Sequence, residues 1–586
     1  MEEIKGEIKE PVSDKELEKR KNKIKNFFFG WIKDNYDKVF FAILIGAFIL
    51  RFWIFLKTMN QPLWWDEADY LSAGKRMGLG LDIRDIWYYR RGFLFPIVSA
   101  LFFFTGLGET GIRFLMVLFS TGIVAVSYFL ISKMFNKKVA LLTSLALTLS
   151  WIFLFFTGRI LTDIPAAFFL LLSLFFFWKG YVLKEGNKFL YLFGLVFALA
   201  VLTRMQSLML APPFLFYVFM TEKLKVFKNK KLWITLGIFL ILLVPHFILY
   251  SMHYGNPLGD ITSHYLGIGE KAIEFEDQRT FSTATFNYFK SIPYMISIPL
   301  FVMLLIGAIY FFGDLIIGFD KITKDETLKN KLFVLMWVLS LFLIMGYIGS
   351  VSYVEERYVS SGLPFLFLIA ISPLMLLEKI IIKNFNLKKI LAALVIFVVL
   401  FSLLIPNFLW ANSLLEKQSR SYSLIQYTGN LLKENSNPED IIISTSLPQI
   451  TYYSERSTYP YDVHYDGLHK GDKELLKYAD SEEGFKEFLL EKKPRFLMVS
   501  SIFESYPEWM LTKGETGGMN YVYMPFFNSS MLYNPDTGQI ISLDLKEEVK
   551  NKDYTLKLFF PQEPEEINGV FIYEVIYPDF EKQTSL

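Results

Sequence analysis

The chain contains no cysteine and only five histidines among its 586 residues. The absence of cysteine excludes disulfide bonds, thiolate catalysis and cysteine-ligated zinc, and so few histidines disfavour an imidazole-based metal site. An excess of charge of one sign is also missing, since 60 basic and 58 acidic residues leave a formal net charge of +2. The sequence therefore carries no polyanion-binding signal, and we find no nucleic-acid-binding motif in it.

Hydrophobic residues are what the sequence has in excess. They make up 53% of the chain, and 18% of the residues are aromatic, more than a soluble protein of this size carries. The first apolar run, 39–57, is long enough to span a bilayer and is not followed by a small-residue cleavage site. These features predict a membrane protein whose first span is a retained anchor and not a signal peptide.

Two rules together predict the topology: a span needs about 20 apolar residues, and short basic loops face the cytoplasm. The run 92–107 is interpreted as a helix lying at or dipping into the outer surface, because counting it as a span would put the basic stretch 133–139 outside. Dividing 188–221 into two helices around Arg204 keeps the basic loop 223–231 inside. About eleven spans result, near 39–57, 111–132, 138–156, 164–183, 188–203, 206–221, 232–251, 292–313, 332–350, 360–381 and 389–408.

These spans divide the chain into three parts. We expect a cytoplasmic N-terminal segment (1–38), an all-α polytopic membrane domain (39–409) and a small external α/β domain (410–586). The last part is charged and rich in turn signals, and no internal repeat is found. Its strand-like runs lie at 441–445, 495–500 and 570–577, and its helical patterns lie around 419–434 and 482–491. The prediction is a multi-pass protein of the cell membrane with a cytoplasmic N-terminus and an extracytoplasmic C-terminal domain.

Charged residues gather at the predicted outer ends of the helices. Ionisable groups near a bilayer cost up to several kcal/mol when they are unpaired, so they usually form pairs or line a cavity. The members of this group are Asp66, Glu67, Asp69, Arg90, Arg91, Arg159, Asp163, Arg204, Glu355, Glu356 and Arg357, with His264 in an external loop. This one-sided gathering is the main functional signal in the sequence.

The acidic members also have ordinary structural interpretations. Asp66 followed by Asp69 fits an N-cap with an acidic third position, opening a helix over 67–77. Arg159 and Asp163 lie four apart around a turn, where an ion pair could join two helices.

The remaining members have structural alternatives too. Arg90 and Arg91 fit side chains that snorkel to the membrane interface. His264 fits a surface histidine in a long loop, and Tyr358 fits the aromatic belt. Single residues therefore do not decide between structure and catalysis.

The order of several short motifs favours the catalytic interpretation of these charged residues over the structural one. The sequence resembles the GT-C glycosyltransferases, and more narrowly the branch of protein O-mannosyltransferases and lipid A aminoarabinose transferases. The resemblance covers about two thirds of the chain, while the C-terminal domain matches only in type. The motifs are, in order, WWDEADY (64–70), YYRRGFLFP (88–96), GRILTDIP (158–165), FNYFKSIPY (286–294) and ERYVSSGLPFLFLIA (356–370).

The resemblance implies a transferase that uses a polyprenyl-phosphate sugar, carried on dolichyl or undecaprenyl phosphate, at the outer membrane face. The acceptor would be a protein, lipid or glycan hydroxyl, and no nucleic acid is expected as a partner. No cofactor is certain, and a divalent metal is left open. His264 matches a zinc-binding loop histidine of the aminoarabinose transferases, but Arg90 stands where those enzymes have a zinc-binding glutamate.

The resemblance also assigns roles to residues. Asp66 corresponds to the proposed base, with Glu67 beside it and Asp163 as the second-loop aspartate. Because phosphate leaves as an anion without prior protonation, the reaction needs cations and no general acid. A carboxylate partly desolvated under Trp64 and Trp65 should have a raised pKa. The expected phosphate contacts are Arg91 and Arg357, with Arg90, Arg159 and Arg204 as further candidates, and His264 and Tyr358 are candidates for an acceptor or metal loop.

Two other classes of protein stay open at this point. A polytopic transporter would also place charges in the membrane region, although carriers tend to show internal repeats. A membrane-anchored sensor or scaffold would use the external domain to bind a partner. Among transferases, an oligosaccharyltransferase carries its WWDYG motif in the terminal external domain, whereas WWDEAD lies here in the first loop. We therefore favour transfer of a single sugar.

Overall fold

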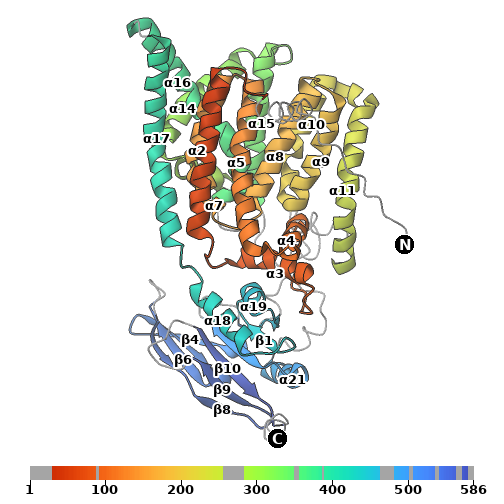
Figure 1. Ribbon diagram of the computed structural model, residues 1–586, viewed down its shortest axis with the longest axis vertical. Helices are drawn as coiled ribbons and strands as arrows, with labels where there is room; N and C mark the ends of the chain where they lie inside the picture. Colours follow the sequence, from red (N-terminus) through yellow and green to blue (C-terminus); the bar gives the residue numbers. More distant parts are fainter. Residues whose placement is uncertain are drawn as a thin grey trace, which may run out of the picture.

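The computed structural model describes residues 30–87, 91–254, 283–348, 355–385, 388–461, 481–500, 506–534, 540–561 and 570–578. Figure 1 shows a long bundle of helices with a sheet-containing domain at one end, and two short helices, α3 and α4, between them. The expected fold class, a polytopic helical domain followed by a small domain with a β-sheet, is confirmed.

Among the described residues, eight helices are long and apolar enough to cross a membrane, or nine if one bent pair counts as a single span. The eight are built on α2 (Asn35–Thr58), α5 (Gly108–Met134), α8 (Asp163–Phe177) with η1 (Trp178–Val182), α11 (Lys230–Tyr254), α14 (Ile298–Ile317), α15 (Glu326–Ile348), η9 (Glu356–Gly362) with α16 (Leu363–Phe385), and α17 (Lys389–Lys417). The bent pair is α6 (Lys137–Leu149) and α7 (Trp151–Thr157), at 49°.

Two of the expected spans correspond to shorter helices. They are α9 (Asn187–Thr203) and α10 (Ala211–Glu222), separated by the 3-10 turn η2 (Met205–Leu210). A span needs about 17–25 residues, and these two helices have 17 and 12. The shorter connecting elements are η3 (Lys223–Lys228), η6 (Thr283–Phe286), α12 (Asn287–Lys290), α13 (Ile292–Ile296) and η7 (Phe319–Lys321).

Arg51, a charge inside α2, caps the break between α6 and α7. Its guanidinium is fully buried and donates to the carbonyl oxygens of Leu147 (3.2 Å) and Thr148 (3.5 Å) and to Ser120 Oγ (2.7 Å). The last carbonyls of a helix lack intrahelical partners and carry partial negative charge. The structure therefore gives this buried arginine a local structural role.

The basic loops meet at one end of the bundle. Lys137, at the start of α6, pairs with Asp34 (2.8 Å) and Asp37 (2.7 Å) just before and within α2. Lys138 pairs with Glu378 near the end of α16, and Lys133 pairs with Glu185 (2.6 Å). The helices α3 and α4 lie at the opposite end of the bundle (Figure 1).

The helices α3 (Trp65–Leu79) and α4 (Leu94–Phe104) pack against each other at that end. Gly74 on α3 allows this approach, because a Cβ there would lie 2.5 Å from Ser99 Cβ. Gly80 ends α3 with φ +65°, a conformation that favours glycine. The expected surface helix at 92–107 corresponds to α4.

The C-terminal domain contains two sheets. The six-stranded sheet has the order β2-β1-β3-β10-β9-β8, parallel across β2, β1 and β3 and antiparallel elsewhere, and the second sheet, β4-β5-β6-β7, is antiparallel. The strands are β1 (Ile441–Ser444), β2 (Ser457–Tyr459), β3 (Phe496–Ser500), β4 (Thr512–Thr516), β5 (Met519–Met524), β6 (Ser529–Tyr533), β7 (Ile540–Asp544), β8 (Glu548–Lys550), β9 (Thr555–Phe560) and β10 (Val570–Ile576). The helices are α18 (Ser423–Glu434), α19 (Leu447–Ser454) and α21 (Glu482–Lys492), with the turns η10 (Glu508–Met510) and η11 (Pro525–Phe527).

Strand β3 shows how the six-stranded sheet is filled on both faces. Phe496 and Met498 pack in one apolar cluster, and Leu497 and Val499 pack in the other. Successive strand side chains point to opposite faces, so a strand buried on both faces is apolar at every position. The three strand-like runs expected from the sequence correspond to β1, β3 and β10, which are neighbours in this sheet.

Helix α19 fastens this domain to the membrane domain. Tyr453 Oη accepts a hydrogen bond from Leu63 N (2.9 Å), and Gln449 Nε2 donates to Leu63 O (3.1 Å). Lys75 on α3 pairs with Glu455 (2.7 Å) at the end of α19. The C-terminal domain therefore holds the segment that leads into α3.

Candidate active site

The site is built around Asp66, in the first turn of α3. Asp66 Oδ1 accepts a hydrogen bond from Arg91 Nη2 (2.8 Å), and Asp66 Oδ2 lies 3.4 Å from Arg357 Nη2. Arg91 Nη1 also lies 3.0 Å from Asp69 Oδ2, one turn further along α3. Asp66 therefore joins two arginines that come from distant parts of the chain.

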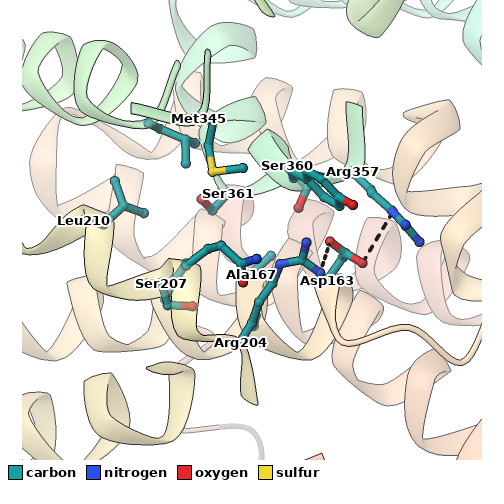
Figure 2. A pocket seen from close by; sticks show the side chains of 14 residues that line it. Asp163, Ala167, Arg204, Ser207, Leu210, Met345, Arg357, Ser360 and Ser361 are labelled. Carbon is teal, nitrogen blue, oxygen red and sulfur yellow. Dashed lines mark ion pairs between the residues drawn. The ribbon is translucent and has the colours of Figure 1, made fainter. Parts of the chain in front are cut away.

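Asp163, the first residue of α8, extends this arrangement. Its carboxylate pairs with Arg204 Nη1 (2.8 Å) and with Arg357 Nε (3.8 Å), and Figure 2 shows the two guanidinium groups on either side of it. Glu355 contributes a further carboxylate, 3.3 Å from Arg357 Nε. Charges of opposite sign thus alternate through six residues that we call the carboxylate–arginine cluster: Asp69, Arg91, Asp66, Arg357, Asp163 and Arg204.

The members of the cluster differ in exposure. The Asp66 side chain is 34% exposed and that of Arg91 is 26% exposed, whereas Asp163 is 2% exposed. A ligand approaching the cluster would therefore meet Asp66 and Arg91 first. Asp163 is placed to hold Arg204 and Arg357 in position.

The electrostatic environment of Asp66 differs from the expectation. Burial by itself would raise the pKa of this carboxyl, but the charges of Arg91, Arg357 and Arg204 outweigh burial and lower the pKa to about 2. The expected raised pKa is therefore not found. In this state Asp66 is ionised and is a weak base.

A small pocket adjoins the cluster and has two chemically different ends. Asp163, Arg204 and Arg357 line one end, and Leu210 and Met345 line the other (Figure 2). The pocket is narrow in this state: its cavity volume is about 20 Å³, room for about one water molecule. The Arg204 guanidinium lies over the ring of Tyr358, 4.3 Å from its centroid, so Tyr358 belongs to the charged end. The residue types at the two ends suit an anion joined to an apolar group, for which the pocket would have to widen.

Glu67 and Arg159 lie in a second network, outside the cluster. Glu67 has no exposed surface and accepts hydrogen bonds from Trp64 N and Ile160 N, both at 2.6 Å. It therefore performs the helix-capping task that Asp66 was considered for. Its Oε2 also lies 3.5 Å from Arg159 Nη1.

Arg159 faces away from the cluster. Its side chain is 1% exposed, stacks on the Trp64 ring at 4.0 Å, and donates to the carbonyl oxygens of Pro62 (3.3 Å) and Gln418 (3.1 Å). This placement departs from the expected phosphate contact, because the guanidinium is surrounded by protein. It also departs from the alternative of a pair with Asp163, whose partners are Arg204 and Arg357.

Two of the expected site residues, Arg90 and His264, lie outside the described residues. Within the residues that the structure describes, no group of three or more histidine, aspartate or glutamate side chains could hold a metal ion. The cluster carboxylates each face an arginine instead. The described residues therefore do not fit a bound divalent metal, and no chemical step is assigned to one.

Sequence analysis missed a buried support beside the site. Arg113 donates to Gln61 O (2.6 Å) and pairs with Glu109 (2.7 Å), and Tyr452 Oη donates to Glu109 Oε2 (2.7 Å). These contacts tie α5 to the segment before α3 and to α19. The signal available in the sequence was an oppositely charged pair four residues apart at the start of a span.

Comparisons with known proteins agree with this architecture. Residues 91–249 match the family described as dolichyl-phosphate-mannose-protein mannosyltransferase, a segment that contains Arg91, Asp163 and Arg204. No curated protein sequence matches the chain.

Two solved structures share the fold. ArnT from Cupriavidus metallidurans bound to undecaprenyl phosphate matches with a TM-score of 0.56 and 14% identity, over 81% of this chain and 94% of that one. An oligosaccharyltransferase from Archaeoglobus fulgidus, tethered to an acceptor peptide containing the NVT sequon, matches with a TM-score of 0.55 and 12% identity, over 88% of this chain and 76% of that one. The chain therefore shares the fold of these two proteins, and this agrees with the resemblance to GT-C glycosyltransferases seen in the order of its sequence motifs.

Proposed function

We propose that this protein transfers a single sugar from a polyprenyl-phosphate donor to an acceptor hydroxyl at the outer membrane face. In this proposal Asp66 takes the acceptor proton, Arg91, Arg357 and Arg204 hold the donor phosphate, and Asp163 positions the arginines. The donor class also agrees with the undecaprenyl phosphate bound to the structurally similar ArnT.

The observation that carries the proposal is the two-ended pocket beside the cluster. Arginine suits the phosphate end because its planar fork donates in pairs to phosphate oxygens and stays charged beside lipid. Leu210 and Met345 at the other end offer an apolar surface to the first part of a prenyl chain. A soluble sugar nucleotide would have no use for that apolar end.

The reaction would proceed as a substitution at the anomeric carbon. The acceptor oxygen forms a bond to this carbon as the bond to the phosphate oxygen breaks, which inverts the configuration. The acceptor proton passes to the Asp66 carboxylate, and the polyprenyl phosphate leaves with the electron pair of the broken bond as a dianion. The arginines stabilise the second negative charge, so no general acid is required.

The low pKa of Asp66 in the free protein is compatible with a role as base once the donor is bound. A donor phosphate would share Arg91 and Arg357 with Asp66 and would bring a negative charge next to it. Both changes raise the pKa of a carboxyl. The ion pairs seen in the structure would then represent the resting state, and donor binding would generate the base.

The proposal also states that one sugar is transferred per reaction and that the cluster faces outward. The match to ArnT covers 94% of that chain, whereas the match to the oligosaccharyltransferase leaves about a quarter of that chain without a counterpart. This difference favours single-sugar transfer. The lysine-rich loops at the end of the bundle opposite α3 favour an outward-facing cluster.

A transfer assay tests the proposal directly. Purified protein is incubated with radiolabelled dolichyl-phosphate mannose and, separately, with an undecaprenyl-phosphate sugar, each with membrane extract as the acceptor source. We expect acceptor-dependent release of the polyprenyl phosphate, which Asp66→Asn abolishes. Binding of the donor without release by any acceptor fraction would instead support a transporter, and no binding at all would support an anchored scaffold.

A further inference from the structure

A second cavity lies at the lysine-rich end of the bundle, opposite the carboxylate–arginine cluster. It contains about 1290 Å³ of empty space, including its open mouth, and lies between the ends of α5, α8, α10 and the starts of α9, α11 and α15. Four lysines line it: Lys133, Lys184, Lys231 and Lys329. Because none of these residues belongs to the proposed reaction, the cavity needs a separate explanation.

The cavity has more positive than negative charge available. Two glutamates, Glu222 and Glu326, also line it, and the Asn229 amide donates to Glu222 (3.0 Å), which orients this carboxylate without removing its charge. Lys133 pairs with Glu185. In the part of the chain that the structure describes, Lys184, Lys231 and Lys329 form no ion pair. Three ammonium groups therefore stand against two carboxylates in the lining, which leaves an excess of one positive charge to attract an anion.

The wall that carries Lys184 has unusual backbone geometry. Helix α8 continues into the π-helical turn η1, and Lys184 follows in the left-handed region with φ +54°. Gly180 in this turn packs so closely on α9 that a Cβ would lie 2.4 Å from Leu190 N. A π-turn and a left-handed non-glycine residue both cost free energy and cluster at functional sites.

The surroundings of the cavity identify the kind of anion. Leu183 lines the cavity and is 39% exposed, and Trp233, two residues after Lys231, is 53% exposed. Trp233 lies in the first turns of α11, and only 17% of the apolar stretch of that helix is buried. Tryptophan at the end of a lipid-facing helix marks the membrane interface. The cavity therefore lies where lipid headgroups lie, and its rim can contact acyl chains.

We propose that this cavity binds the phosphate headgroup of an anionic membrane lipid. Lys184, Lys231 and Lys329 would contact the phosphate, and Leu183 and the exposed face of α11 would contact the acyl chains. Basic pockets between membrane helices are known to take such headgroups. The inference does not depend on the proposed sugar transfer.

The test uses the purified protein and measures bound lipid by native mass spectrometry. Phosphatidylglycerol and phosphatidylcholine of the same acyl length are titrated separately, and inorganic phosphate is added as a competitor. We expect phosphatidylglycerol to bind at least about tenfold more tightly than phosphatidylcholine, since each nearby lysine contributes to binding an anionic lipid. The variant K184Q/K231Q/K329Q should lose about tenfold in affinity for phosphatidylglycerol, and inorganic phosphate should not displace the lipid at equal concentration.

The matched control is K223Q/K225Q/K228Q. It removes the same charge from exposed lysines of η3 at the same end of the bundle, outside the cavity. It should bind phosphatidylglycerol like the unmodified protein, and all proteins should keep the same thermal unfolding temperature without lipid. An equal loss of phosphatidylglycerol affinity in both variants, or no preference for phosphatidylglycerol over phosphatidylcholine, would overturn the proposed lipid site. Displacement by inorganic phosphate would show a soluble anion to be the occupant and would overturn the lipid assignment.

Discussion

Arg357 Nη2 lies 3.4 Å from Asp66 Oδ2, although 291 positions of sequence separate the two residues. The contact joins the helix that follows the first membrane span to the turn that precedes α16. Through Arg357, Asp66 is also connected to Asp163 and Arg204. Four of the five motifs recognised along the sequence, all except 286–294, therefore contribute a residue to one cluster.

Replacement of Asp66 by Asn should abolish transfer while leaving the fold intact. Asp66 is partly exposed, and Asn keeps its size while removing the proton acceptor. Loss of a general base typically lowers kcat by about 10²- to 10⁴-fold. Single-turnover kinetics with saturating donor measures this step. Asp82→Asn, the same substitution at an exposed position just after α3, is the matched control. Full activity of Asp66→Asn would show that Asp66 is not the base.

The pH dependence of the reaction should differ between free and donor-bound protein. The pKa of Asp66 is lowered to about 2 in the free protein, below its usual value of about 3.9. The stability that this ionised carboxylate contributes is present above the unfolded-state pKa and is lost as the pH falls through about 2. Because kcat/KM reports on the free protein, its profile should show no acid limb from Asp66 above about pH 4.

The profile of kcat reports on the donor complex. As the pH is lowered, kcat should begin to fall at a higher pH than kcat/KM does. Donor phosphate shares the arginines and raises the pKa of Asp66. Arg91→Met should move the acid limb of kcat/KM upward, toward that of kcat, because it removes one of the charges that hold the pKa down. Identical acid limbs for kcat and kcat/KM in the unmodified protein would contradict generation of the base by donor binding.

Glu67→Ala should destabilise the protein much more than it changes donor binding. The substitution leaves the Trp64 and Ile160 N–H groups without their acceptor and leaves Arg159 buried without its carboxylate. Breaking a buried pair in this way costs about 3–5 kcal/mol. Denaturant unfolding in detergent measures the loss, with the exposed Glu416→Ala on α17 as the control. A large fall in donor affinity with unchanged stability would instead show that Glu67 takes part in donor binding.

Tyr453→Phe tests whether the C-terminal domain positions α3. Removing the hydroxyl leaves the buried Leu63 N–H without its acceptor, at a cost of about 1–3 kcal/mol. Because Leu63 lies two residues before the first residue of the helix that carries Asp66, we expect a lower kcat with an unchanged Kd for the donor. Tyr427→Phe, at a residue that is 54% exposed, is the control. An unchanged kcat would show that this contact only attaches the C-terminal domain and does not position α3.

Sequence analysis predicted the fold better than it predicted the site. Apolar runs and basic loops predicted the helices and their two ends, because span length and loop charge are local properties of the sequence. The basic loop 223–231 correctly predicted a break at Arg204, and α9 agrees with the expected 188–203. Helix α10 starts at Ala211 instead of the expected 206, since hydrophobicity does not show that η2 is a 3-10 turn. In the C-terminal domain, the largely buried strands β1, β3 and β10 were visible as apolar runs, whereas the exposed β4 was not.

Within the site, neighbours in sequence proved to have different surroundings. Asp66 and Glu67 are consecutive on a helix, where successive side chains point about 100° apart, so one faces the arginines and the other faces the α7–α8 turn. Arg159 and Asp163 lie at opposite ends of that turn and face different networks. The pKa of Asp66 could not be predicted, because it depends on how many arginines the tertiary structure brings to one carboxylate.

The central claim is that the arginines of the cluster bind a polyprenyl-phosphate sugar. The most direct measurement is the Kd of dolichyl-phosphate mannose and of an undecaprenyl-phosphate sugar for the unmodified protein, for R91A/R357A and for K184Q/K231Q/K329Q. Since a hydrogen bond to a charged group contributes about 1.5–3 kcal/mol, R91A/R357A should bind the donor at least about tenfold more weakly. The lysine variant should bind it like the unmodified protein. Equal affinity of all three proteins, or a loss confined to the lysine variant, would contradict the account.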